Sequence, residues 1–215
     1  MSETRLKITE IFYSLQGEAR NVGLPTVFIR LTGCPLRCEY CDTAYAFTGG
    51  EWMEIESILD EVKKHNTSHV TVTGGEPLAQ KNCITLLQQL CNQGYDVSLE
   101  TSGAILVDAV DKRVVKILDV KTPASGEVDK NKFENFALLN TEDQIKFVIC
   151  DENDYQWSKQ VMIEHQLEKK CELLFSPCHD LLDATTLADW VLRDQLNVRL
   201  QIQLHKYLWG DKPGV

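Results

Sequence analysis

Short apolar runs recur along the chain, and each is bounded by polar or turn-forming residues. The runs are rich in β-branched side chains, which is typical of strands buried in a sheet. The segments between them repeat apolar residues at i, i+3 and i+4, which predicts amphipathic helices. The expected strands are 26–32, 69–73, 96–100, 114–120, 144–149, 171–176 and 199–204, and the expected helices are 53–65, 78–93, 153–169 and 184–195.

This alternation of strands and helices predicts a parallel sheet with crossover helices. The chain has 215 residues, which falls short of the roughly 250 residues usual for a closed eight-stranded barrel. We therefore expect an α/β fold, a partial (open or truncated) parallel β/α barrel, with residues 1–215 forming a single domain. Residues 121–142 have no clear period and many turn formers, so we expect a loop-rich insert there, near the functional face.

The formal net charge of −10 narrows the range of partners. Such a surface repels nucleic acid and anionic membranes, so we expect neither as a partner and favour a small substrate. The N-terminus MSETRLKITE is polar, and no apolar run approaches the roughly 18 residues of a spanning helix, so neither export nor membrane insertion is indicated. We expect a cytoplasmic protein.

Three of the eight cysteines, Cys34, Cys38 and Cys41, lie together with C-x3-C-x2-C spacing directly after the strand at 26–32. In a protein that is not secreted, cysteines are mostly reduced, which favours metal or redox chemistry over disulfides. A structural zinc site would need a fourth ligand nearby, and none is present. Three thiolates can hold an iron–sulfur cubane and leave one iron open to another ligand. The spacing favours a [4Fe–4S] cluster, with zinc binding and chance spacing as the alternatives.

Other unusual residues also follow predicted strands. The sequence GGEP (74–77) follows the second strand, ETSG (100–103) the third, DVKTP (119–123) the fourth and FSPCH (175–179) the sixth. Since parallel α/β folds place their chemistry at the carboxyl ends of the strands, we expect these loops and the cysteine loop to converge on one mouth.

The cysteine triplet, with Tyr40 before its last member, resembles the signature of radical S-adenosylmethionine enzymes. The resemblance implies that the open iron binds the amino and carboxylate groups of S-adenosylmethionine. It also implies an external electron donor, flavodoxin-like or ferredoxin-like, that drives cleavage of this cofactor to methionine and a 5′-deoxyadenosyl radical. The radical then takes a hydrogen atom from the substrate.

Further positions suit such a cofactor. Gly74 and Gly75 let the backbone approach a ligand closely, and Glu76 can accept hydrogen bonds from an ammonium group, as in the family's GGE motif. Alone, GGEP would be an ordinary strand-to-helix turn. The remaining candidate contacts are Tyr40, Asp42, Thr101, Ser102, Lys121, Ser176, Pro177 and Cys178. Several of these could equally serve as cap or turn residues.

The run EIFYSLQGEARNVGLPTVFIRLTGCPLRCEYCDT and the near-terminal QLHKYLW closely resemble the radical enzymes that convert 6-carboxy-5,6,7,8-tetrahydropterin to 7-carboxy-7-deazaguanine, with loss of ammonia, on the route to queuosine. The resemblance implies a homodimer, a Mg²⁺ ion held by Thr43, and a set of substrate contacts. These contacts are Leu15, Gln16, Gly17, Glu18, Arg30, Thr73 and His205. The segment after the last predicted strand is short, so we expect it to fold over the barrel mouth and bring the terminal Val215 to the substrate as well. The usual form SLQGEG has Ala19 here in place of its last glycine.

The chemistry of these residues suits a pterin. Gln16 and Glu18 can match the donors and acceptors along its edge, and Arg30 can pair with a carboxylate through two hydrogen bonds. Taken alone, Arg30 could form a structural ion pair, His205 could be an ordinary half-buried histidine, and Thr43 could cap a turn.

Two other functions remain open. A glycyl-radical-enzyme activating protein would share the cysteine loop, the GGE turn and a small partial barrel, but it would lack SLQGE and HKYLW and would act on a protein. A zinc-stabilised binding module would have no turnover.

Overall fold

The structure is a computed structural model that describes residues 4–210, 212 and 214. Nine strands form one sheet in the order β3-β1-β2-β4-β5-β6-β7-β8-β9. They are β1 (Arg5–Leu15), β2 (Pro25–Leu31), β3 (Glu51–Glu54), β4 (His69–Gly74), β5 (Asp96–Thr101), β6 (Val115–Val120), β7 (Gln144–Ile149), β8 (Glu172–Pro177) and β9 (Arg199–Leu200). The α-helices are α1 (Ile55–Lys63), α2 (Cys83–Asn92), α3 (Glu152–Glu164), α4 (Ala184–Arg193) and α5 (Leu204–Trp209).

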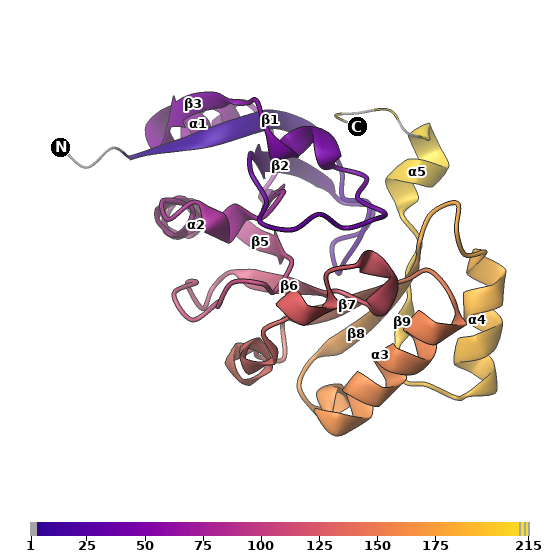
Figure 1. Ribbon diagram of the computed structural model, residues 1–215. Helices are drawn as coiled ribbons and strands as arrows, with labels where there is room; N and C mark the ends of the chain where they lie inside the picture. Colours follow the sequence, from indigo (N-terminus) through magenta and orange to yellow (C-terminus); the bar gives the residue numbers. More distant parts are fainter. Residues whose placement is uncertain (1–3, 211, 213, 215) are drawn as a thin grey trace.

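Strand β2 pairs in parallel with β4, and each strand from β4 to β9 pairs in parallel with the next. Strand β1 pairs antiparallel with both β2 and β3. The sheet curves without closing, because β3 and β9 are its two edges (Figure 1). This topology confirms the expected partial parallel barrel. Its open form leaves the carboxyl ends of the parallel strands arranged around a shared concave side.

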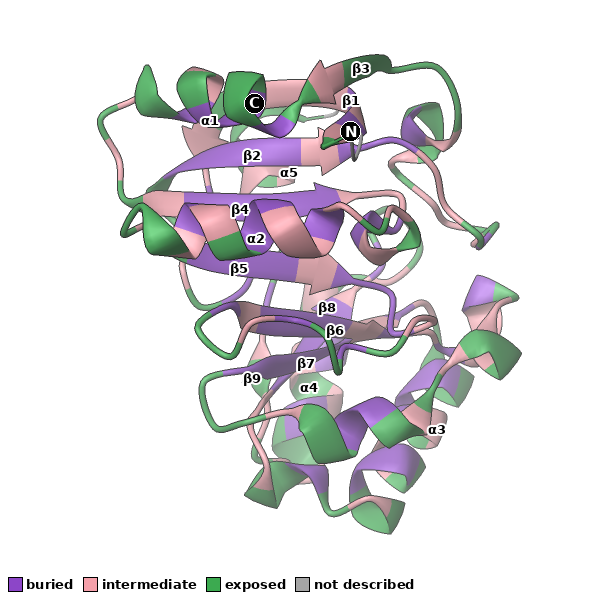
Figure 2. Ribbon diagram, turned by 90° about the vertical axis from the view of Figure 1, so that its left-hand side faces the viewer, coloured by how far each residue is buried: buried purple, intermediate pink, exposed green. Residues whose placement is uncertain are grey.

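Helices α1 to α4 cover the outer side of the curved sheet, and each buries residues against the strands (Figure 2). Helix α5 has no buried residue. In α1 the stripe consists of Ile55, Ile58, Leu59 and Val62, which follows the i, i+3, i+4 spacing of the sequence. Carboxylate caps start two of the helices: Asp151 accepts from the N–H of Asp154 in α3, and Asp183 accepts from the N–H of Thr186 in α4. These helices and the strands share one main hydrophobic core.

All seven predicted strands are present, but the last one is much shorter than expected. It ends at Leu200, and residue 204 begins α5 instead of ending a strand. The prediction also missed β1 and β3. In β1 a register shift between Ile8 and Glu10 breaks the alternation that would have indicated a strand.

The connections around β6 also differ from the expected alternation. Residues 102–114, between β5 and β6, and residues 121–143, between β6 and β7, contain no α-helix. The second connection contains three short 3-10 helices, Pro123–Ser125, Val128–Lys130 and Phe133–Leu138. The last of these sends Phe136 into the main core. The expected insert at 121–142 is therefore irregular but packed.

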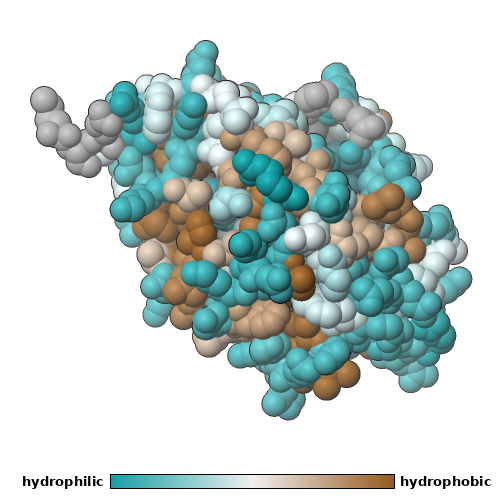
Figure 3. All heavy atoms as spheres, viewed as in Figure 1, coloured by the Kyte–Doolittle hydropathy of each residue, from teal (hydrophilic) through white to brown (hydrophobic). Residues whose placement is uncertain are grey.

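The surface seen in Figure 3 is largely hydrophilic, with hydrophobic residues in separate patches. None of the helices in the described part of the chain combines the length and hydrophobicity needed to span a bilayer.

Candidate active site

A cavity of about 590 Å³ opens at the carboxyl ends of the parallel strands. The loops that the sequence analysis selected all contribute to it, which confirms that they converge. The predicted residues that line it are Leu15, Gln16, Gly17, Glu18, Arg30, Cys34, Cys38, Tyr40, Cys41, Asp42, Thr43, Thr73, Gly74, Gly75, Thr101, Ser102, Lys121, Ser176, Pro177, Cys178 and His205. Glu76 does not line the cavity, and Val215 lies outside the described residues.

The wall of the cavity has two parts. The first, which we call the cysteine side, consists of the lining residues of 34–43, of Gly74, Gly75, Thr101, Ser102 and Lys121, with Glu76 buried directly below them. The second, the tail side, consists of residues 15–18, Arg30, Lys146 and 203–205.

On the cysteine side, the loop that carries the three thiols begins directly after β2. The N–H of Gly33 donates to the carbonyl of Ala46 over 2.8 Å, and Arg37 donates to the carbonyl of Cys34 while its guanidinium lies 4.3 Å from the ring centre of Phe47. None of these three contacts involves a sulfur atom of the cysteines. The N–H of Glu39 also donates to the carbonyl of Ser125 over 3.0 Å, so the loop is held by residues 33–47 and by the connection after β6.

The three thiols are free, partly exposed, and open onto the same cavity. The pKa of each thiol is raised by burial, that of Cys38 to about 11. The positive charge of the nearby Lys121 opposes this rise in all three but does not cancel it. Within the described residues, no three side chains of His, Cys, Asp or Glu converge on one point suitable for a single metal ion. Three cysteine thiols on one cavity are the ligand number that would leave one iron of a cubane open to another ligand.

Two glycines let the next loop pack directly against the cysteine loop. A Cβ on Gly74 would lie 2.3 Å from the carbonyl oxygen of Leu31, and a Cβ on Gly75 would lie 2.6 Å from the Cβ of Cys34. Both distances are far too short for real contacts. The glycines are thus required by the packing of the protein itself, in addition to any close approach of a ligand.

Glu76 is fully buried below this wall. Its carboxylate accepts from the hydroxyl of Thr101, from the N–H and hydroxyl of Ser102, and from the N–H of Leu78. It therefore ties the loop after β4 to the end of β5. The predicted contact of Glu76 with the cofactor's ammonium group stays a prediction, because the hydrogen bonds of its carboxylate are with Leu78, Thr101 and Ser102.

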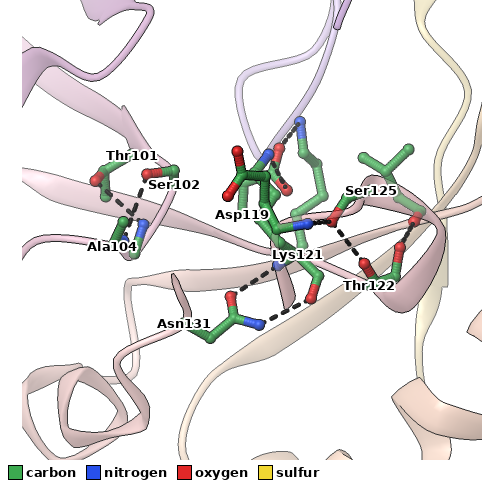
Figure 4. A network of polar contacts seen from close by, with 12 residues as sticks. Thr101, Ser102, Ala104, Asp119, Lys121, Thr122, Ser125 and Asn131 are labelled. Carbon is green, nitrogen blue, oxygen red and sulfur yellow. Dashed lines mark hydrogen bonds and ion pairs between the residues drawn. The ribbon is translucent and has the colours of Figure 1, made fainter. Parts of the chain in front are cut away.

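Lys121 projects from the end of β6, and its backbone is held by the side-chain amide of Asn131 through two hydrogen bonds of 2.9 and 2.8 Å (Figure 4). Its ammonium lies 3.1 Å from Asp119. Burial alone would lower the pKa of Lys121, but Asp119 and Cys38 raise it, so the group is a cation next to the thiols. Such a cation suits a carboxylate or sulfur ligand.

On the tail side, Lys146 of β7 lies opposite Asp119 of β6 in the strand register. Its Nζ is 2.7 Å from Oε2 of Glu18 and 3.3 Å from Oδ2 of Asp119. Burial lowers the pKa of Lys146, but Glu18, Asp119 and Glu100 outweigh burial and raise it well above its ordinary value. Sequence reasoning missed this residue; the available signal was a lysine inside the apolar run QIKFVI.

Gln16 and Thr73 shape the floor near Glu18. The amide of Gln16 donates to Thr71 over 3.0 Å, and its oxygen accepts from the N–H of Glu18. Thr73 donates to Glu100 over 3.1 Å, and burial raises the pKa of Glu100. The Gln16 amide is therefore occupied by protein contacts, and it fixes the 16–18 backbone at the cavity wall.

Arg30 lies opposite Glu10 of β1, and its Nε donates to Oε1 of Glu10 over 2.7 Å. The hydroxyl of Tyr45 donates to the same oxygen over 2.8 Å. The structural ion pair considered for Arg30 is thus present, and the residue also lines the cavity beside Phe12 and Tyr45. These aromatic neighbours and Glu10 were not predicted.

The C-terminal segment closes over residues 15–18. The N–H of Leu204 donates to the carbonyl of Gly17 over 3.0 Å, and Gln203 donates to Oε1 of Glu18 over 2.8 Å. A Cβ on Gly17 would lie 2.1 Å from Nδ1 of His205, so only glycine fits beneath this histidine. Burial lowers the pKa of His205.

Ala19, which replaces the usual glycine, has a φ of 61°. This left-handed conformation costs an alanine roughly 1–2 kcal/mol. The side-chain amide of Gln201 holds it by accepting from the N–H of Ala19 over 2.8 Å and donating to its carbonyl over 3.2 Å. The backbone at this position therefore keeps the shape that glycine would adopt.

Three further predicted positions, Asp42, Thr43 and Ser176, present polar groups to the cavity. The hydroxyl of Ser176 is buried at the cavity and has no hydrogen-bond partner among the described residues. Thr43 donates to Asp42 over 2.7 Å, and both line the cavity. Burial would raise the pKa of Asp42, but the hydrogen bonds from Thr43 and Gln203 lower it, so it presents a carboxylate.

Comparisons with known proteins show the family of this chain. Residues 28–119 match the family model described as the radical SAM superfamily. The 7-carboxy-7-deazaguanine synthase of Chlorobaculum tepidum is 45% identical, with 100% of this chain and 99% of the relative aligned, and that of Koribacter versatilis is 44% identical over 95% and 97%. The crystal structure of QueE from Escherichia coli shares the fold, with a TM-score of 0.78 and 24% identity over 94% of this chain and 95% of that one.

The relatives are similar over nearly their whole length, and the matched superfamily region contains the cysteine loop and the GGE turn. The chain therefore belongs to the 7-carboxy-7-deazaguanine synthase family of the radical SAM superfamily.

Proposed function

We propose that this protein is a lyase that converts 6-carboxy-5,6,7,8-tetrahydropterin to 7-carboxy-7-deazaguanine with loss of ammonia. The observation that carries the proposal is the single cavity in which the three thiols of the cysteine side face the Glu18, Arg30 and His205 of the tail side. The family membership favours this function over a glycyl-radical-enzyme activating protein.

Cys34, Cys38 and Cys41 would hold the [4Fe–4S] cluster, and the buried hydroxyl of Ser176 and the Lys121 ammonium would bind S-adenosylmethionine. When bound, the cluster and this cofactor supply a 5′-deoxyadenosyl radical that can take a hydrogen atom from C6 of the pterin. The role of the protein is then to position C6 and to exclude water.

The tail side would orient the substrate. The Glu18 carboxylate would accept N–H groups from the pterin edge, and Arg30, already held on one side by Glu10, would pair with the pterin's carboxylate. His205 would close the site from above, since it packs directly on Gly17.

The proposal extends to Mg²⁺ at Thr43. This hydroxyl and the adjacent Asp42 carboxylate present two oxygen ligands to the cavity, which suits a hard ion that keeps several waters and is completed by the substrate. Thr43→Ala should weaken stimulation by Mg²⁺ and leave the absorption spectrum of the cluster unchanged. Activity of the unmodified protein that does not depend on Mg²⁺ would contradict this assignment.

The proposal also includes a cytoplasmic homodimer served by a flavodoxin-like or ferredoxin-like electron donor. The decisive assay incubates the reduced, reconstituted protein anaerobically with S-adenosylmethionine, Mg²⁺ and the pterin, and identifies the product by mass spectrometry. We expect 7-carboxy-7-deazaguanine. An untouched pterin, together with a glycyl radical on an added partner protein, would replace this proposal with the activating function.

A further inference from the structure

Lys146 connects the two sides of the cavity. Its side chain is 11% exposed, and its ammonium contacts Glu18 on the tail side and Asp119, which in turn pairs with Lys121 on the cysteine side. The residue lines the cavity.

The contacts of Glu18 show what Lys146 does locally. One carboxylate oxygen, Oε2, lies against the Lys146 ammonium, and the other, Oε1, accepts from Gln203. Each oxygen is thereby fixed in direction. A carboxylate has about four lone-pair sites, so two partners leave capacity for further donors from the cavity. A pterin edge offers adjacent N–H groups that a fixed carboxylate can accept together.

The charges around Lys146 make its role specific. Glu18 comes from the loop after β1, Glu100 from β5 and Asp119 from β6, so three carboxylates surround this ammonium. Asp119 has a second cation in Lys121, but the only other described partner of the Glu18 carboxylate is the neutral amide of Gln203. Loss of Lys146 would therefore disturb Glu18 far more than Asp119.

We propose that Lys146 is a positioning residue for the pterin: its ammonium holds the Glu18 carboxylate turned toward the cavity, ready to accept the N–H groups of the substrate edge. This proposal rests on the proposed function. It assigns a role to a residue on β7, far in sequence from the motif that contains Glu18.

The test measures equilibrium binding instead of turnover. Calorimetry on the reconstituted protein, with an oxidised cluster and no reductant, gives separate dissociation constants for S-adenosylmethionine and for the pterin. We expect Lys146→Met to weaken pterin binding about tenfold to a hundredfold, as for a lost charged hydrogen bond, and to change S-adenosylmethionine binding less than about threefold. Lys146→Arg, which keeps the charge, should recover most of the pterin affinity.

Lys116 provides a matched control. It is a buried lysine on β6, 3.0 Å from the buried Asp143, and it does not line the cavity. Lys116→Met removes the same kind of ion pair, so it should lower the melting temperature without a selective loss of pterin affinity. If Lys146→Met does not fold, Lys146→Gln replaces it in the same comparison.

A double-mutant cycle identifies the partner. In a Glu18→Gln background, Lys146→Met should weaken pterin binding by less than about threefold, because the carboxylate that it positions is already gone. Equal pterin affinity in the unmodified protein and Lys146→Met would overturn the positioning role while leaving the proposed function intact. If the unmodified protein does not bind the pterin, the proposed function itself fails, and this role falls with it.

Discussion

The two sides of the cavity are assembled in different ways. On the cysteine side, contacts join the ends of neighbouring strands, as when Thr101 donates to Glu76 across 25 positions of sequence. On the tail side, Glu18 meets Lys146 across 128 positions and Gln203 across 185. The cysteine side therefore forms with the sheet, whereas the tail side depends on three distant segments meeting. Substitutions on the tail side should thus impair substrate binding while leaving the cluster in place.

The largest expected effect is loss of the cluster from the cysteine side. Replacing Cys34, Cys38 or Cys41 with Ala removes a ligand that no nearby residue can supply. The iron content should therefore fall from about four irons per chain to nearly none, and cleavage of S-adenosylmethionine should stop. Cys83→Ala is the control, because Cys83 is buried in α2 away from the cavity. Iron and sulfide analysis after anaerobic reconstitution checks this. Full iron content in the Cys34→Ala variant would remove the basis of the cluster assignment.

The next largest effect concerns the buried Glu76 carboxylate, which links the loop after β4 to the end of β5. Glu76→Gln places an amide N–H₂ among the donors from Thr101, Ser102 and Leu78, so the free energy of unfolding should fall by about 3 kcal/mol. Glu56→Gln, on the exposed face of α1, should change it by less than about 0.5 kcal/mol. Urea denaturation of both variants gives the comparison. Equal free energies of unfolding for Glu76→Gln and Glu56→Gln would show that the Glu76 carboxylate does not hold these two loops together.

A smaller and more selective effect is expected on the tail side. Gly17→Ala would put a Cβ 2.1 Å from the ring of His205 and push the start of α5 away from the cavity. We expect KM for the pterin to rise about tenfold, with the cluster spectrum unchanged. Gly23→Ala, where an added Cβ meets nothing within 4 Å but the φ of 85° strains an alanine, is the control for backbone strain that leaves His205 untouched, and it should leave KM for the pterin unchanged. A bleached cluster in Gly17→Ala would mean that the two sides are not separable.

The smallest effect is a pH dependence of stability. Burial lowers the pKa of His205, so the unfolded chain binds a proton at higher pH than the folded protein does. The contribution of His205 to the free energy of unfolding is therefore fully present above its pKa in the unfolded chain, about 6.5, and is lost as the pH falls below that value. The unmodified protein should lose more stability than His205→Gln between about pH 7.5 and about pH 5.5. Identical losses would indicate that the His205 ring is solvated.

The same contrast explains what the sequence could predict. The cysteine triplet and the GGE turn are short contiguous motifs, and each follows an apolar run that is a strand in the structure, so the convergence of these loops could be foreseen. Lys146 could not, because a lysine in a strand usually points to solvent and its partner Glu18 lies in a distant loop.

Two errors in the predicted fold have a similar origin. The run RLQIQL alternates like a strand, but Gln201 turns to bind the backbone of Ala19 and Gln203 turns to bind Glu18, which ends β9 at Leu200. The strand β1 was missed because its irregularity at Ile8 and Glu10 hides the alternation. In both cases a feature that local patterns do not report decides the backbone: side-chain contacts with residues 18 and 19 in the first, and a shift in the pairing of β1 with β2 in the second.

The central claim is that one cavity brings a cofactor held on the cysteine side to a pterin held on the tail side. The most direct measurement uses pterin carrying deuterium at C6, incubated anaerobically with the reduced enzyme, Mg²⁺ and S-adenosylmethionine. If the two sides position C6 beside the 5′ carbon, mass spectrometry should find deuterium in the recovered cofactor together with deuterium-depleted 7-carboxy-7-deazaguanine. Turnover of the pterin with no deuterium in the cofactor would contradict the account.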